Sequence, residues 1–119
     1  MNDDAQATVK AYFAALAAKD VSRVAWSENA TLRTPLNPNG GEATLIRGRK
    51  GILDFFADIL PAICGVKFVR YYTGEKGWAA GQAEMALANG KTLYVLDAFR
   101  IEQGKIVEQQ NHYDSRAAS

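Results

Sequence analysis

Apolar side chains recur at helical spacing in two parts of the chain. Between positions 5 and 16, and again between positions 49 and 60, they return every three or four residues, which places them on one face of a helix. Pro61 ends the second pattern, because proline cannot continue a helix. A shorter helical pattern follows the first one at 20–26. The spacing therefore predicts two amphipathic helices and one short helical segment.

The remaining segments have the features of strands. A first strand is predicted over 30–35, where Pro35 ends it, and a loop over 36–42 follows. After the second helix the chain divides into four further strand segments: 66–73, 77–87, 91–102 and 105–113. Asn89-Gly90 and Gln103-Gly104 separate the last three, and such boundaries favour tight hairpins. We therefore expect adjacent antiparallel strands in the second half of the chain.

The order of these elements, helices first and most strands last, predicts a single α+β domain over residues 1–119. Amphipathic helices must bury their apolar faces, and the available partner is one face of an antiparallel sheet. A curved sheet wrapped around the N-terminal helices forms a cone, or half-barrel, that encloses a pocket. Polar side chains on the inward strand faces would then point into that pocket.

One carboxyl group interrupts an apolar strand face. Alternation along the segment 91–102 puts Asp97 on the same face as Leu93, Val95 and Phe99. A buried, unpaired carboxylate is very costly, so Asp97 should be paired, hydrogen-bonded or neutral. A neutral carboxylic acid can donate a hydrogen bond to an oxyanion. We therefore predict a functional role for Asp97 in the pocket, and a purely structural carboxyl is the alternative.

Composition sets limits on function. The 119 residues are 48% hydrophobic and 23% charged, with a formal net charge of +1, as in an ordinary globular domain. This charge gives no electrostatic basis for a nucleic-acid partner or a membrane surface. Cys64 is the sole cysteine, which excludes an intrachain disulfide and favours a reducing, cytoplasmic location. His112 with Asp114 offers too few ligands for a metal, and we expect no metal and no cofactor.

Several short motifs carry a family resemblance. They are AYFAAL at 11–16, NATLRTP at 29–35, IRGR at 46–49, DAFRI at 97–101 and GKIV at 104–107. With the order of elements, they make the chain resemble the nuclear-transport-factor-like cone superfamily, and within it the ketosteroid isomerase and SnoaL-like polyketide cyclase branch. The resemblance covers nearly the whole chain. It implies the cone fold, whereas the activity has to be argued from the site, because this fold carries many activities.

The resemblance also implies site residues. In ketosteroid isomerases a first-helix tyrosine and a late-strand aspartic acid donate hydrogen bonds to the steroid dienolate, and the matching residues are Tyr12 and Asp97. The general base of those enzymes is an aspartate directly before the proline of the first strand. This chain has Thr34 there, which cannot take up a proton at neutral pH. For substrate binding we expect Thr34, Phe56, Gln82, Val95, Phe99, Gln109 and Tyr113.

A second branch of the superfamily, the limonene epoxide hydrolases, implies a different chemistry. Those enzymes use an arginine and two aspartates on inward strand faces to position and activate a water molecule. Matching the motifs at 104–106 and 113–114 places Gln82, Glu84 and Asn111 at these positions. Asn111 would position the water and Glu84 would deprotonate it. Both are therefore further candidate catalytic residues.

Three functions from different classes follow, and we favour the first. It is an isomerase, dehydratase or cyclase in which Tyr12 and Asp97 stabilise an enolate-like intermediate of a hydrophobic carbonyl compound. The second is a non-catalytic carrier or sensor of such a ligand, which the threonine at position 34 favours. The third is an interaction module whose pocket is filled by its own side chains. Under all three we expect a homodimer, because Tyr94 and Leu96 fall on the outward face.

Overall fold

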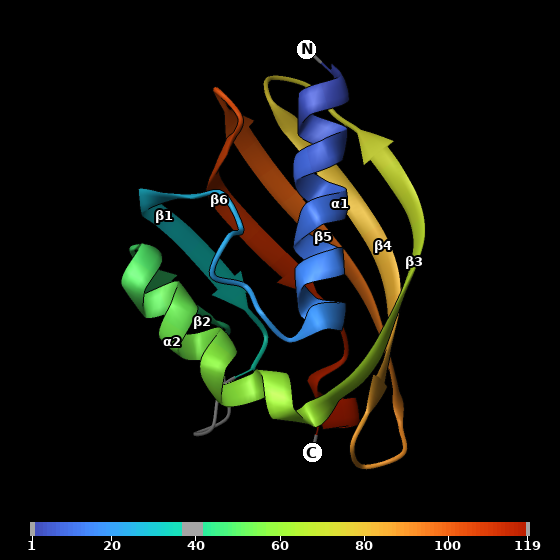
Figure 1. Ribbon diagram of the computed structural model, residues 1–119. Helices are drawn as coiled ribbons and strands as arrows, with labels where there is room; N and C mark the ends of the chain where they lie inside the picture. The colour runs from blue at the N-terminus through green and yellow to red at the C-terminus, as the bar shows by residue number, and fades with distance from the viewer. Residues whose placement is uncertain (1, 37–41, 119) are drawn as a thin grey trace.

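The computed structural model describes residues 2–36 and 42–118, and Figure 1 shows how their helices and strands are arranged. In chain order these are α1 (Asn2–Ala18), β1 (Trp26–Thr34), β2 (Thr44–Arg47), α2 (Arg49–Ile59), β3 (Ile63–Thr73), β4 (Trp78–Leu87), β5 (Thr92–Glu102) and β6 (Lys105–His112). Short 3-10 turns, η1 (Leu60–Ala62) and η2 (Ser115–Ala118), follow α2 and β6. Both predicted amphipathic helices are present, and Pro61 lies in the turn that ends the second.

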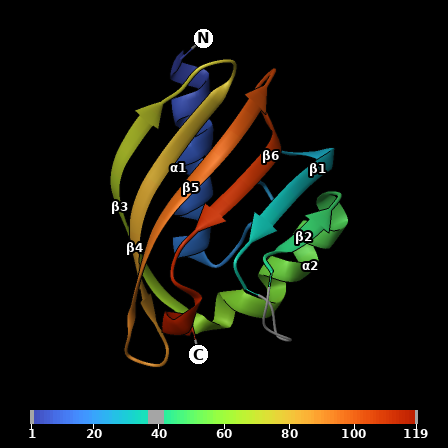
Figure 2. The same cartoon turned by 180° about the vertical axis from the view of Figure 1, so that it is seen from behind.

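The strands form one curved, open sheet in the order β2-β1-β6-β5-β4-β3. β5 pairs antiparallel with β4 and with β6, as the signals at Asn89-Gly90 and Gln103-Gly104 predicted. Among the described strands, β1 and β6 are the one parallel pair. Figure 2 shows the outer face of the sheet, with α1 behind it. The α+β fold with a curved sheet is thus confirmed, and the sheet is mostly antiparallel.

Both helices cover the inner face of the sheet. α1 packs on β3 and β4, and α2 packs on β1 and β2. Gly81 of β4 allows α1 to approach closely, since a Cβ atom there would overlap the Phe13 ring and lie 2.9 Å from Val9 Cγ1. Gly81 is also the partner of Asp97 in the register of β4 and β5. The close contact with α1 therefore helps to exclude water from the Asp97 carboxyl.

Two local features differ from the prediction. Residues 20–26 contain a turn instead of a short helix, because the Asp20 carboxylate accepts hydrogen bonds from the Ser22 backbone and hydroxyl, at 3.0 and 2.7 Å. β1 begins at Trp26, earlier than predicted. The edge strand β2 was not predicted, since four residues are too few to show clear alternation. Most of the predicted loop over 36–42 lies outside the described residues.

Candidate functional site

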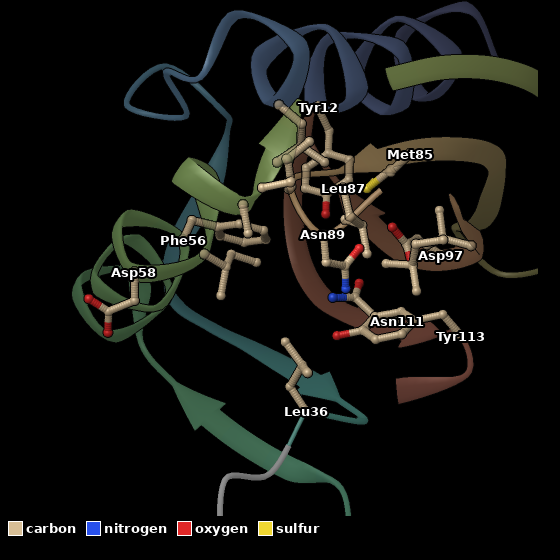
Figure 3. A pocket seen from close by; sticks show the side chains of 17 residues that line it. Tyr12, Leu36, Phe56, Asp58, Met85, Leu87, Asn89, Asp97, Asn111 and Tyr113 are labelled. Carbon is tan, nitrogen blue, oxygen red and sulfur yellow. The ribbon is translucent and has the colours of Figure 1, made fainter. Parts of the chain in front are cut away.

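A cavity of about 370 Å³ lies between the helices and the inner face of the sheet. Most of its lining is apolar and comes from α1, α2, β4 and β5. Figure 3 shows Asp97, Asn111 and Tyr113 on one side of the cavity, and Phe56 and Asp58 of α2 on the other. The cone therefore encloses an open pocket, which disfavours an interaction module with a filled one.

Asp97 lies on the inner face of β5, as the alternation predicted. Val95 and Phe99, two residues away on either side, are buried with it, whereas Tyr94 and Leu96 are exposed on the outer face. Only 1% of the Asp97 surface is exposed to solvent. The carboxyl group is thus placed in an apolar environment at the edge of a cavity.

Burial decides the protonation state of Asp97. Its Oδ1 atom is fully buried and has no hydrogen-bond partner in the described part of the chain. Burial is the largest effect and raises the pKa of Asp97 to about 8, although hydrogen bonding from the His112 backbone and from the Tyr12 hydroxyl favours the charged form. At neutral pH Asp97 is therefore mainly a neutral carboxylic acid.

Tyr12 connects Asp97 to the polar groups of β6. Its hydroxyl oxygen accepts a hydrogen bond from Gln109, and its proton is donated to Asp97. Its ring packs edge-on against Phe56 and Phe99, with centroids 5.9 and 5.2 Å apart. Burial, reinforced by the nearby Asp97, raises the pKa of Tyr12 well above its usual range. The hydroxyl is therefore a permanent donor, and the group to which it donates is Asp97.

A buried hydrogen-bond chain fixes the amide groups beside this pair. The Trp26 indole Nε1–H donates to Gln109 Oε1 at 2.9 Å, and Gln109 Nε2 donates to Asn111 Oδ1 at 3.0 Å. An indole N–H can only donate, so Trp26 fixes the orientation of the Gln109 amide, and Gln109 fixes that of Asn111. Asn111 consequently turns its Nδ2–H group, a hydrogen-bond donor, away from Gln109.

The end of β1 supports Tyr113. Thr34 Oγ1 lies 2.9 Å from the Tyr113 hydroxyl, and the Leu36 backbone N–H donates to Thr34 Oγ1 at 3.4 Å. The Thr44 hydroxyl donates to the Leu36 carbonyl at 2.8 Å, which holds this stretch of backbone in place. Burial raises the pKa of Tyr113 to about 12 against the opposing hydrogen bond from Thr34, and the nearby Asp97 adds to the rise. Tyr113 therefore also keeps its proton.

Most of the residues predicted to form the site are brought together. The cavity lining includes Tyr12, Phe56, Val95, Asp97, Asn111 and Tyr113. The buried residues directly behind it are Thr34, which contacts Tyr113, Gln109, which contacts Asn111, and Phe99, which packs on Tyr12. Thr34, Gln109 and Phe99 thus support the lining and do not form it.

The structure does not bring Gln82 and Glu84 to the cavity. They lie on the outer face of β4, where the Tyr72 hydroxyl donates to Gln82 Oε1 at 2.8 Å. The reason is alternation, since the inward position between them is taken by the buried Ala83. Asn111 lines the cavity, so the pairing of Asn111 with Glu84 that activation of a water molecule needs is not present.

Several lining residues were not predicted. The sequence pattern could have placed Met85 in the lining, because alternation on β4 puts it on the same inner face as Ala83. No such pattern places Leu36, Asp58 and Asn89, since they lie near the ends of elements, where no periodic pattern extends. These three positions depend on how distant elements meet.

Among the described residues, no group of three or more His, Cys, Asp or Glu side chains is placed to hold a metal ion. None of the helices in these ranges has the length and apolar character needed to cross a membrane.

Solved structures share this fold. Bal32a, from a soil-derived mobile gene cassette, has a TM-score of 0.81 and 19% identity, with 98% of this chain and 94% of that chain covered. A proposed isomerase from Bacillus subtilis has a TM-score of 0.78 and 20% identity, with coverages of 97% and 89%. IdmH, a proposed polyketide cyclase from Streptomyces antibioticus, has a TM-score of 0.75 and 15% identity, with coverages of 95% and 94%. At these identities the similarity shows the fold alone.

Sequence comparison gives the family. No curated protein matches this sequence. The family model of the SnoaL-like domain, however, matches residues 9–109, which include most of both helices and nearly the whole sheet. The chain therefore belongs to the SnoaL-like domain family.

Proposed function

We propose that this protein is a small-molecule enzyme that binds a hydrophobic carbonyl compound and stabilises an enolate-like intermediate of it. The single observation that carries the proposal is the Asp97 carboxyl, which lines an apolar cavity, is buried and mainly neutral at pH 7, and has one oxygen without a hydrogen-bond partner. A buried polar atom without a partner is rare in native proteins and calls for an explanation. A ligand oxygen that accepts the Asp97 proton supplies one.

The chemistry follows from the growth of charge on the ligand oxygen. When the carbon next to a carbonyl loses a proton, the carbonyl oxygen becomes a negatively charged enolate oxygen. A fixed hydrogen-bond donor binds this enolate oxygen more tightly than it binds the original carbonyl oxygen. A donor of this kind contributes about 3 kcal/mol to stabilisation of the transition state. Asp97 is the donor that touches the ligand. Tyr12 acts through Asp97 as a positioning residue, since its own proton is already donated to the carboxyl.

A non-catalytic carrier of the same ligand is the second candidate, and the observation that favours it is the environment of Thr34. In the position where ketosteroid isomerases have their base, this residue is buried and bonded to Tyr113. Among the described residues of the cavity lining, the carboxyl groups are those of Asp58 and Asp97. Figure 3 shows the Asp58 carboxylate directed away from the cavity. Turnover therefore has to be tested separately from binding.

The first experiment measures binding of substituted phenols of graded pKa, which mimic an enolate oxygen, with ultraviolet titration of the bound phenol. The variants are Asp97→Asn and Asp97→Leu. The asparagine amide still offers an N–H donor, so we expect a loss of about tenfold. Leucine presents no donor, and we expect a loss of about a hundredfold or more. Equal binding by the leucine variant would refute the proposal.

Screening of enones and 1,3-diketones then separates the two candidates. An enzyme turns over at least one compound that binds, and Asp97→Leu abolishes the turnover. A carrier binds the same compounds with the same dependence on Asp97 but converts none of them. Tyr12→Phe is the matched positioning variant, and we expect an intermediate loss because Asp97 then keeps its proton but loses one of its two supporting bonds.

We also propose that the outer face of the sheet forms a homodimer. Its exposed apolar side chains include Tyr72, Tyr94 and Leu96, which lie close enough to line one shallow depression there. A contiguous exposed apolar patch favours association with another protein surface. Sedimentation of the wild type should give a dimer and Tyr94→Lys a monomer. A monomeric wild type at high concentration would contradict this proposal.

A further inference from the structure

Two donors other than Asp97 are presented to the cavity, and the function proposed above does not use them. The first is the Asn111 amide. Its Oδ1 is engaged by Gln109, whose orientation Trp26 fixes, so Nδ2 is the end of the amide that remains for a ligand. Asn111 lines the cavity and is 8% exposed. It therefore offers an N–H group to the same space as Asp97.

The second donor is the Tyr113 hydroxyl. Thr34 Oγ1 accepts the Leu36 N–H and lies 2.9 Å from the Tyr113 oxygen, and either hydroxyl of this pair can donate to the other. When Thr34 donates, the Tyr113 proton is free to point to the cavity that Tyr113 lines. Thr34 is the positioning residue of Tyr113.

The cavity brings three donors to one side of the sheet. Asp97 of β5 lies directly opposite Asn111 of β6, and Tyr113 follows two residues after Asn111; all three line the cavity. A carbonyl oxygen has two lone pairs and accepts two hydrogen bonds. The three donors therefore exceed what a single carbonyl oxygen can accept.

We propose that Asn111 and Tyr113 form a second oxygen-binding subsite beside Asp97, so that the ligand carries two oxygen acceptors at one end of an apolar skeleton. One oxygen accepts the Asp97 proton, and the second accepts from Asn111 and Tyr113. The apolar remainder lies against Phe56 and the rest of the lining from the helices. This inference rests on the proposed function, because it takes Asp97 as the donor to the first oxygen.

The test compares two probes with the same skeleton. 2-Naphthol carries one oxygen, and 2,3-dihydroxynaphthalene carries two neighbouring oxygens; both are fluorescent, so their dissociation constants are measurable by titration. In the wild type we expect the second oxygen to strengthen binding by about tenfold, the effect of one or two hydrogen bonds. In Tyr113→Phe we expect most of this advantage to be lost. Thr34→Val removes only the supporting hydroxyl and should lose part of it.

The measured quantity is the ratio of the two dissociation constants, which isolates the second oxygen. Phe56→Leu is the matched control, since it changes the apolar lining and should weaken both probes alike, leaving the ratio within about twofold. Thermal unfolding establishes that each variant is folded. A wild-type ratio near one, or a ratio that Tyr113→Phe leaves unchanged, overturns the second subsite. Loss of the Asp97 dependence of 2-naphthol binding would instead overturn the proposed function, so the two failures are distinguishable.

Discussion

The raised pKa of Asp97 predicts an unusual dependence of stability on pH. The value is 3.8 for an ordinary aspartate and about 8 in this fold, a difference of about four units. Because the folded state favours protonated Asp97, the contribution of this group to the free energy of unfolding is fully present below pH 3.8. This contribution is lost as the pH rises toward 8, since Asp97 ionises in the unfolded chain at a lower pH than in the folded one.

The size of the effect follows from 1.36 kcal/mol per pKa unit. Between pH 5 and pH 7 the unfolded carboxylate is ionised and the folded one is mainly neutral, so two units of pH remove about 2.5 kcal/mol of stability. Asp97→Asn cannot ionise and keeps the shape of the side chain. The free energy of unfolding of this variant, minus that of the wild type, should therefore increase by about 2.5 kcal/mol from pH 5 to pH 7.

Urea unfolding at both pH values measures this difference. All other titrating groups are shared by the two proteins, so their contributions cancel. Asp58→Asn is the control, because it makes the same chemical change at a carboxyl that is exposed in the folded state. A difference for Asp97→Asn that stays constant within about 0.5 kcal/mol would show that Asp97 ionises normally, and the neutral donor would be refuted.

Two further substitutions test the packing around the site. Gly81→Ala should lower the free energy of unfolding, measured in urea, by about 1 to 3 kcal/mol, because the new methyl group overlaps the Phe13 ring. The control is Gly65→Ala, whose Cβ would be 3.9 Å from its nearest neighbour. Equal effects of the two substitutions would contradict the close approach of α1 to β4. Trp26→Phe should cost at least about 2 kcal/mol by the same measurement, because it leaves the buried Gln109 Oε1 without its donor. A near-neutral effect would mean that this hydrogen bond does not hold the amide chain.

The features of the site that the sequence predicted are local ones. Alternation of period two along residues 91–102 was sufficient to place Asp97 on an apolar inner face, and helical spacing was sufficient to bury Tyr12. The same reasoning applies to Glu84, which lies next to the buried Ala83 and therefore faces outward. Its assignment to the site came from a motif match, and the periodic pattern of its own strand was the better guide.

The supporting contacts could not be predicted, because they join distant parts of the chain. Thr34 and Tyr113 are 79 positions apart, and Trp26 and Gln109 are 83 apart. Both contacts require β1 to lie parallel to β6, with an irregularity in its register. Hairpin signals specify only antiparallel neighbours, so no pattern along the sequence indicates this pairing.

The parallel pairing of β1 and β6 places the residues that could select the ligand away from the residues that keep Asp97 protonated. Strands that run in the same direction end at the same edge of the sheet, and here that edge brings Thr34 and Tyr113 together. Asp97, by contrast, lies within β5, between β4 and β6, where α1 packs closely on its partner Gly81. Changes after the ends of β1 and β6 can therefore retarget the cavity to other molecules without altering the packing that keeps Asp97 neutral. An engineer seeking new ligands for this domain would begin at those two strand ends.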